Sequence, residues 1–374
     1  MISQRQLFLN HLAQTSPTPL GLEIEKAEGV YMFATDGRKY IDMISGISVS
    51  NVGHRHPHVL QAINDQLDKY MHLMVYGEFI QSPQIKLAQN LTSLLPASLS
   101  SCYFVNSGSE AVEGALKLAK RYTGRTNIVS FKNAYHGSTA GALSVMGNET
   151  FKQAFRPLLP GINFGIFNDE RSVELINEDT ACVIIEPIQA EAGVIKPHDN
   201  FLTKLRTICN KTGSLLIFDE AQCGFGRTGT FFAFEQFDAI PDILILAKGM
   251  GGGMPIGAFI SSKKIMSTLT ENPVLGHITT FGGHPVSCAA SLACIEVIEN
   301  EKLIETVKEK SELIKENINS TLIKTKRNSG LLLSFECENE EICKKTIDNC
   351  IKSGVLTDWF LFNSKCMRIA PPLT

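Results

Sequence analysis

The sequence predicts an α/β protein, with a mainly parallel central sheet in a large domain and a smaller α+β domain after it. Two observations support this prediction. Short aliphatic runs alternate with stretches long enough for a helix, the pattern of parallel strands covered by helices on both faces. Beyond about residue 285 the alternation stops, and a long helical segment precedes shorter strand-like pieces, which is typical of an α+β lobe.

Each predicted element has its own pattern in the sequence. Residues 29–43 predict a β-hairpin around Asp36-Gly37. Residues 53–57, GHRHP, lead into a helix, because Pro57 suits a first helical turn and apolar residues follow at helical spacing. The aliphatic runs that predict strands are 128–129, 182–185, 215–218, 243–247 and 258–260. Apolar residues on one stripe through 295–318 predict a single amphipathic helix. The strand-like pieces that follow are GLLLSFECEN, SGVLTDWFLF and KCMRIAPPL.

These elements predict three parts of the chain. Residues 53–285 form the large domain and residues 286–374 the small domain. Residues 1–52 are expected to pack against the small domain or against a neighbouring subunit.

Composition and charge narrow the class of protein. The 374 residues are 44% hydrophobic and 20% charged, with a formal net charge of -3. Such a chain has no global basic field, so we expect neither nucleic acid nor an anionic membrane as a partner. The N-terminus has an apolar run of only three residues, and no stretch approaches the roughly 20 apolar residues of a membrane span. We therefore expect a cytoplasmic protein.

The cysteines and histidines do not predict a metal site. The ten cysteines include no CxxC pair, and Cys182, Cys223, Cys288 and Cys294 lie in apolar or glycine-rich runs. Reduced cysteines in such runs behave as small hydrophobic residues. The histidines near residue 54 have no second group of ligands at zinc spacing.

Three predicted strands end in ionisable residues. ACVIIEP ends at Glu186, LLIFDE at Asp219 and Glu220, and DILILAKG at Lys248. Ligands of open parallel sheets bind outside the carboxyl ends of the strands, so these side chains predict an active site. The alternative is a buried structural salt bridge.

A phosphate site is predicted where NSGSEAVEGALK, residues 106–117, opens a helix. Free amides at a helix N-terminus, here those of Gly108 and Ser109, bind anions. A capped helix start is the alternative. The segment has no GxxxxGK[ST] pattern, and GMGGGM at 249–254 does not complete GxGxxG, which weakens a nucleotide-binding interpretation.

The same residues suit an aldehyde cofactor that carries a phosphate. Such a cofactor needs a lysine for an imine, a carboxylate for its pyridine nitrogen, an anion cradle and an aromatic face. Lys248, Asp219, Gly108 with Ser109, and Tyr135 supply one of each. A carboxylate about 3 Å from the pyridinium would contribute about 5 kcal/mol at an effective dielectric near 20, enough to keep the nitrogen protonated.

The sequence resembles the class III pyridoxal-phosphate aminotransferases of fold type I, the group that contains ornithine and acetylornithine aminotransferases. The resemblance runs from about Gly29 to the C-terminus. Its motifs are GHRHP, NSGSEAVEGALKLAKR, AYHGST, EPIQAEAG, FDEAQCGFGRTG, AKGMGGGMPIGA, TTFGGHP and MRIAPPL.

The resemblance implies a role for each matching cofactor residue. Lys248 would form the imine with pyridoxal 5'-phosphate and shuttle the substrate proton, and Asp219 would pair with the pyridine nitrogen. Gln222 would bind the ring's 3-oxygen. Gly108 and Ser109 match the phosphate turn, and Tyr135 matches the aromatic residue that stacks on the ring. Thr280, with Thr279, matches the threonine that reaches the phosphate from a partner subunit, which implies a homodimer with shared active sites.

For the substrates, the resemblance implies that Arg368 binds the carboxylate of a 2-oxo acid. Glu191 would pair with that arginine when the amino donor is bound. Glu186, Tyr76 and Ser138 are the further residues expected in the substrate pocket. Ser138 stands where ornithine-type members usually have an arginine, which removes a charge and weakens ornithine or acetylornithine as the donor.

The predicted enzyme is therefore a transaminase. It would move an amino group from an ω-amino acid or diamine donor to a 2-oxo acid such as 2-oxoglutarate. An aminomutase or a decarboxylating transaminase of the same fold is the nearer alternative, and a non-catalytic or nucleotide-binding protein is the more distant one. Many relatives continue past the position of Thr374 into a terminal helix, so a truncated chain or a reduced small domain is also expected.

Overall fold

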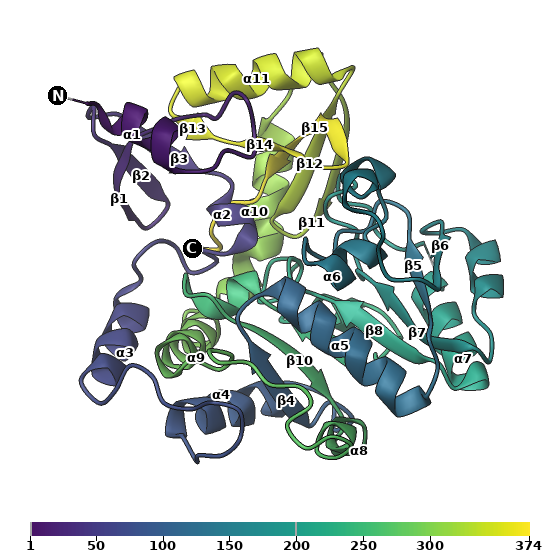
Figure 1. Ribbon diagram of the computed structural model, residues 1–374. Coiled ribbons are helices and arrows are strands. Elements are labelled where there is room, and N and C mark those ends of the chain that lie inside the picture. Colours follow the sequence, from purple (N-terminus) through teal and green to yellow (C-terminus); the bar gives the residue numbers. More distant parts are fainter. Residues whose placement is uncertain (1, 199) are drawn as a thin grey trace.

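Three β-sheets organise the protein in the computed structural model, which describes residues 2–198 and 200–374 (Figure 1). The central sheet has seven strands in the order β4-β10-β9-β8-β7-β5-β6. The two smaller sheets have the orders β1-β2-β3-β13 and β11-β12-β15-β14. This arrangement confirms the predicted α/β fold with a mainly parallel central sheet.

The central sheet is parallel except at β10, which runs antiparallel to both of its neighbours, β4 and β9. Its inner strands are buried on both faces, which is why they appear in the sequence as unbroken aliphatic runs. All five predicted runs coincide with strands, and only Ala247, at the end of the run 243–247, lies outside its strand. The strands are β4 (Ser101–Val105), β5 (Asn127–Phe131), β6 (Ile162–Gly165), β7 (Thr180–Ile185), β8 (Leu215–Asp219), β9 (Ile243–Leu246) and β10 (Gly257–Ser261).

Helix α5 (Gly108–Thr123) crosses one face of the central sheet and packs against β10, β9, β8 and β7 (Figure 1). Its start is fixed by Ser107, whose side chain accepts a hydrogen bond from the Glu110 amide, and it ends at the left-handed Gly124. The other helices of this region are α3 (Pro57–Leu67), α4 (Ser82–Ser93), α6 (Ala140–Val145), α7 (Phe201–Thr212) and α8 (Lys263–Met266).

The prediction of a single long helix through 295–318 is wrong. The structure has two helices, α9 (Pro285–Asn300) and α10 (Leu303–Asn317), which are separated at Lys302, a residue with φ 52°. Helix α9 packs against α3 and α4, whereas α10 also contacts β12 of the C-terminal sheet. The apolar stripe through 295–318 therefore combined residues that are buried against two different surfaces.

The C-terminal sheet is covered by α11 (Glu340–Lys352) (Figure 1). Its strands are β11 (Ile323–Ser329), β12 (Leu332–Cys337), β14 (Asp358–Phe360) and β15 (Asn363–Ile369). The N-terminal region has α1 (Gln4–His11), β1 (Ile24–Glu28), β2 (Tyr31–Ala34), β3 (Lys39–Asp42) and α2 (Ser45–Ser48). The predicted hairpin is confirmed as β2 and β3, and β13 (Val355–Leu356) pairs in parallel with β3. Short 3₁₀ helices lie at 149–151, 153–155, 170–175, 233–236, 248–251 and 267–269.

Arg227 connects distant segments of the chain. Its guanidinium is fully buried and donates hydrogen bonds to the carbonyls of Leu331 and Pro371 and to Oδ1 of Asn51. Because each acceptor lies in a different segment, this one side chain fixes the N-terminal region and the last residues of the chain against the central region.

Two features are absent from the described residues. Within 2–198 and 200–374, none of the helices has both the length and the apolar character needed to cross a membrane. The same residues contain no group of three histidine, cysteine or acidic side chains placed to hold a metal ion.

Candidate active site

A cavity of about 160 Å³ lies at the carboxyl ends of β7, β8 and β9. Glu186 follows β7, Asp219 ends β8 and Lys248 follows β9, so the structure brings together the three strand ends identified from the sequence. The cavity is lined by Ser107, Gly108, Ser109, Tyr135, His136, Gly137, Glu186, Glu191, Asp219, Ala221, Gln222, Ala247 and Lys248.

Asp219 is held in place from two sides. Its Oδ2 lies 2.8 Å from Nδ1 of His136, and its Oδ1 accepts a hydrogen bond of 3.0 Å from the Ala221 amide. Because a carboxylate only accepts, the imidazole carries its proton on Nδ1. His136 was not identified from the sequence. It lies within AYHGST, but the family resemblance gives a role in that motif only to the neighbouring Tyr135.

Lys248 combines three features of a reactive amine. Its backbone has φ 49°, a left-handed conformation that is uncommon for a residue with a side chain. Its Nζ makes no hydrogen bond or ion pair with any residue that the structure describes. Burial lowers the pKa of Lys248, which favours the neutral amine. Local strain and a lowered lysine pKa both concentrate at functional sites.

The other carboxylates of the strand ends have structural partners. Glu186 accepts hydrogen bonds from the Tyr135 and Ala190 amides at 3.1 and 3.2 Å. Burial, together with the charge of Asp219, raises the pKa of Glu186 well above its usual value. Glu220 accepts from the amides of Ala233 and Phe234, at 2.6 Å each, and burial raises its pKa to about 8. Glu220 does not line the cavity, whereas Glu186 fixes the backbone of Tyr135 there.

The first two residues of α5 present unpaired amides. The side chain of Ser107 accepts a hydrogen bond from the Glu110 amide, and the carbonyl of Ser107 accepts one from the Ala111 amide. The amides of Gly108 and Ser109, which lie between them, have no partner among the described residues. The segment is thus a capped helix start whose first two amides are free to bind an anion. Gly137 lies directly against this turn with φ 122°, and a Cβ there would lie 2.1 Å from Oγ of Ser109.

A second cavity of about 430 Å³ adjoins the first, because Tyr135, Glu191 and Lys248 line both. Its further lining residues are Gly46, Ile47, Asp358, Trp359, Leu361 and Arg368. Asp358 and Trp359 were not identified from the sequence.

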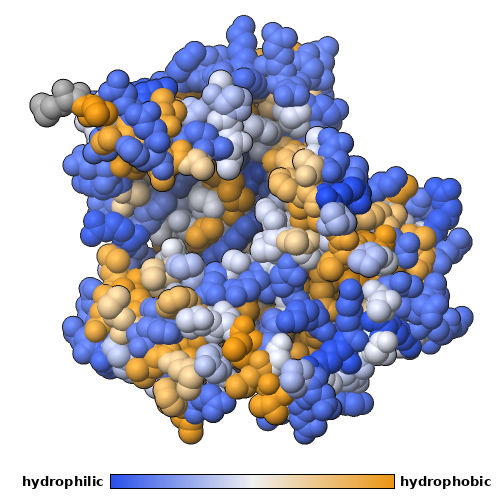
Figure 2. All heavy atoms as spheres, in the orientation of Figure 1, coloured by the Kyte–Doolittle hydropathy of each residue, from blue (hydrophilic) through white to orange (hydrophobic). Residues whose placement is uncertain are grey.

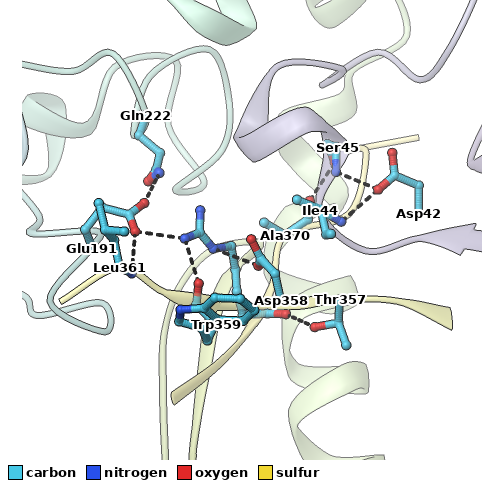
Figure 3. A network of polar contacts seen from close by, with 11 residues as sticks. Asp42, Ile44, Ser45, Glu191, Gln222, Thr357, Asp358, Trp359, Leu361 and Ala370 are labelled. Atoms are coloured by element: carbon cyan, nitrogen blue, oxygen red, sulfur yellow. Dashed lines mark hydrogen bonds and ion pairs between the residues drawn. The ribbon is translucent and has the colours of Figure 1, made fainter. Parts of the chain in front are cut away.

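Arg368 is held by two carboxylates in this second cavity. Its Nη2 lies 2.8 Å from Oε2 of Glu191, and its Nε lies 3.2 Å from Oδ1 of Asp358. Glu191 also accepts from Nε2 of Gln222 at 3.0 Å and from the Leu361 amide at 2.9 Å, as Figure 3 shows. Nη1 and Nε of Arg368 and Oδ1 of Asp358 are buried without a hydrogen-bond partner among the described residues, so the contact with Asp358 is an ion pair without hydrogen-bond geometry. Burial raises the pKa of Asp358 to about 6, although the charge of Arg368 opposes that rise.

Four residues predicted from the sequence do not line either cavity. Ser138 is exposed beside the first cavity, where its amide donates to Oγ of Ser109 and its hydroxyl lies 3.3 Å from that of Tyr135. Thr279 hydrogen-bonds to Glu110 within the same chain, and Thr280 and Tyr76 line neither cavity. The roles of Thr279 and Thr280 require a second subunit, so they stay predictions, as does that of Tyr76.

The residues of the first cavity fit pyridoxal phosphate. An unpaired amine, an oriented carboxylate and two free amides at a helix N-terminus match its aldehyde, its ring nitrogen and its phosphate. Oε1 of Gln222 is buried without a partner among the described residues, so this amide has capacity for a further contact. The fold and the site together define a pyridoxal-phosphate enzyme of fold type I.

The comparison with protein families gives the particular family. The family described as Aminotransferase class-III matches residues 12–374. This chain therefore belongs to the class III aminotransferases, and it is a pyridoxal-phosphate-dependent transaminase. The resemblance stated from the sequence is confirmed, as are the predicted enzyme class and cofactor.

Solved structures agree with this assignment. Ornithine aminotransferase from Toxoplasma gondii is 26% identical, with a TM-score of 0.90 over 98% of this chain and 88% of that one. A transaminase from the marine bacterium Virgibacillus is 27% identical, with a TM-score of 0.91 over 98% of this chain and 93% of that one. An omega transaminase from Pseudomonas jessenii, at 24% identity, has a TM-score of 0.90 over 99% of this chain and 93% of that one, a likeness of fold.

Proposed function

We propose that this transaminase takes its amino group from an ω-amino acid or a diamine and passes it to a 2-oxo acid such as 2-oxoglutarate. The observation that carries the proposal is the pair of carboxylates, Glu191 and Asp358, around Arg368 in the second cavity. The carboxylates suit a donor with a second, cationic amine, and the guanidinium suits the carboxylate of the acceptor.

We propose the following roles for the residues of the first cavity. Lys248 would hold the aldehyde of pyridoxal phosphate and move the substrate proton. Asp219, oriented by His136, would keep the ring nitrogen protonated, and Gly108 and Ser109 would bind the phosphate. When bound, the cofactor supplies the acceptor for the electron pair released at the substrate carbon.

Further cofactor contacts are proposed for two side chains that line the first cavity. Tyr135 would lie against the ring face, because its backbone is fixed by Glu186. Gln222 would bind the ring's 3-oxygen through the part of its amide that Glu191 does not use.

The contact between Arg368 and Glu191 would let one site accept two differently charged substrates. With a cationic donor, Glu191 would keep Arg368 paired and the pocket free of net positive charge. With a 2-oxo acid, Glu191 would move aside and the guanidinium of Arg368 would form a bidentate ion pair with the substrate carboxylate. The exposed Ser138 leaves this pocket without the arginine that ornithine-type relatives usually have, so we expect ornithine and acetylornithine to be poor donors.

We also propose a homodimer with shared active sites. Large apolar side chains are exposed around the segment that carries Thr279 and Thr280, including Ile278 and Phe281. More lie at and between α3 and α4, where Ile80 is 93% exposed and Figure 2 shows hydrophobic groups on the surface. A second copy would cover them and would bring Thr280 to the phosphate of its partner. Light scattering should give twice the chain mass, and Thr280→Ala should weaken cofactor binding.

Two further expectations stay proposals. The ten cysteines are free thiols and eight of them are buried, which suits a reducing compartment such as the cytoplasm.

We propose 53–285 as the large domain and 286–374 as the small domain. The pairing of β3 with β13 supports assigning residues 1–52 to the small-domain side.

A half-reaction screen tests the proposed substrates. The loaded enzyme is mixed with putrescine, 4-aminobutyrate, lysine, ornithine or acetylornithine, and the loss of the cofactor's visible absorbance is followed. We expect one of the first three to react fastest, and net turnover to require an added 2-oxo acid. Lys248→Ala should show no turnover. Fast reaction with acetylornithine, or product formation without an oxo acid, would contradict the proposal.

A further inference from the structure

A third cavity, which we call the basic cavity, lies at the opposite end of α5 from the cofactor site. Its volume is about 480 Å³, and it shares no lining residue with the two cavities of the active site. Helix α5 has 16 residues, about 24 Å, which separates the two sites. The residues that line this basic cavity are Lys117, Lys120, Arg121, Gly124, Arg125, Thr126, Leu269, Gly276 and His277.

Among the described residues, no carboxylate forms an ion pair with the cations of the basic cavity. No aspartate or glutamate is among its lining residues. None of Lys117, Lys120, Arg121 and Arg125 forms an ion pair with any carboxylate in the part of the chain that the structure describes. The helix dipole accounts for cations in the last turn of α5, which are Lys120 and Arg121. It does not account for Arg125, which follows the helix, or for Lys117, which precedes its last turn.

Two of the cationic side chains are fixed as walls of this cavity. Nη1 of Arg125 donates to the carbonyls of Thr180 and Thr212 at 3.1 and 2.9 Å, which anchors the guanidinium to the end of the sheet. Nζ of Lys117 lies 2.9 Å from Nδ1 of His277. An ammonium group only donates, so Nδ1 accepts and the neutral ring carries its proton on Nε2, as a further donor. Burial and the charge of Lys117 both lower the pKa of His277, which keeps the ring neutral.

We propose that the basic cavity binds a small polyphosphate anion. Four cations around one cavity match a ligand with several negative charges, whereas a single carboxylate would leave most of them uncompensated. Guanidinium groups suit phosphate oxygens because they present paired donors in one plane. The chain carries a net charge of -3, so this positive charge is local and matches a small anion rather than an extended polyanion.

Calorimetric titration of the cofactor-loaded enzyme with pyrophosphate tests the proposal, because the bound cofactor fills the other phosphate site. We expect saturable binding of one pyrophosphate per chain, with weaker binding of inorganic phosphate and of glutarate, a dicarboxylate. The double variant Lys120→Ala/Arg121→Ala should bind pyrophosphate at least about tenfold more weakly. The matched control is Lys344→Ala/Lys345→Ala, an exposed pair on α11 that makes the same change in charge.

Visible absorbance of the bound cofactor checks that each variant is folded. The single variant Lys117→Ala, at an exposed position, replaces the double variant if that protein does not fold. The proposal is overturned if pyrophosphate shows no saturable binding or if glutarate binds as tightly. It is also overturned if Lys344→Ala/Lys345→Ala weakens pyrophosphate binding as much as Lys120→Ala/Arg121→Ala does. The readout is binding and not turnover, so it is independent of the proposed transaminase substrates.

Discussion

Nε of Arg368 lies 3.2 Å from Oδ1 of Asp358, in a cavity where the guanidinium is almost fully buried. The same guanidinium lies 2.8 Å from Glu191, so it is shared between two carboxylates. A substrate carboxylate that binds Arg368 must compete with both. Asp358 therefore becomes a candidate for setting the affinity for the 2-oxo acid, even though it was not identified from the sequence.

Asp358→Asn should lower the KM for the 2-oxo acid, by about three- to tenfold, because it removes one competing charge while keeping the side chain's size. The pKa of Asp358 is raised to about 6, so the carboxyl is charged above that pH and neutral below it. The KM of the unmodified enzyme should therefore fall as the pH drops from 7.5 to 5.5, and that of the variant should change less. Steady-state kinetics over this pH range measures both. Asp348→Asn, on the exposed face of α11, is the control, and a higher KM in Asp358→Asn would refute the prediction.

His136→Phe should lower kcat about ten- to a hundredfold, with little change in the KM for either substrate. The substitution removes a hydrogen bond of 2.8 Å to Asp219, and bonds to charged groups are worth about 1.5–3 kcal/mol. His136→Asn keeps a donor near the same place and should recover part of the rate. If the phenylalanine variant shows the original kcat and the original absorbance spectrum, His136 does not orient Asp219.

Gly137→Ala should destabilise the protein by about 1–3 kcal/mol and weaken cofactor binding, because the new Cβ would lie 2.1 Å from Oγ of Ser109. Gly77→Ala is the matched control. Gly77 also has a positive φ, 92°, but a Cβ there would meet nothing within 4 Å. Urea unfolding and cofactor titration of the two variants separate the effect of the contact from that of the backbone conformation. Equal losses in both would show that crowding at Ser109 is unimportant.

Lys248 should be modified at lower pH than an exposed lysine such as Lys345 when cofactor-free protein is reductively methylated. Burial lowers the pKa of Lys248, so its neutral, reactive form is present at a lower pH. Peptide mass spectrometry of samples labelled between pH 6 and 10 gives the midpoint for each lysine. Coinciding midpoints would contradict the lowered pKa.

Much of the fold and part of the site could be predicted because buried parallel strands leave a clear pattern. Lys248 and Asp219 each end or follow an aliphatic run, and the end of such a run is visible without a structure. The strand pattern alone does not choose between Asp219 and Glu220, which both end the run, and it is the family resemblance that selects Asp219. The contacts of Glu220 with the 233–234 amides agree with that choice, because they turn the Glu220 carboxylate away from the cavity.

The second cavity illustrates why the rest could not be predicted. Asp358 reaches Arg368 because β14 pairs with β15, and Glu191 comes from a loop far away in the chain. No local periodicity marks a contact between residues so far apart in sequence. The break between α9 and α10 was missed for a related reason, because an apolar stripe does not show which surface covers each turn.

The place of β4 in the central sheet has a consequence for how the protein is made. The turn at Gly108, which we propose binds the phosphate, directly follows β4. Among the described strands the only sheet neighbour of β4 is β10, which ends at Ser261. A growing chain on the ribosome therefore cannot complete this half of the cofactor site until more than 150 further residues have been synthesised beyond the turn. Pairing across so long a loop is slow to form. We therefore expect the cofactor to bind only after the chain has left the ribosome. Until β10 pairs with β4, the unpaired edge of β4 is the segment that we expect to need a chaperone most.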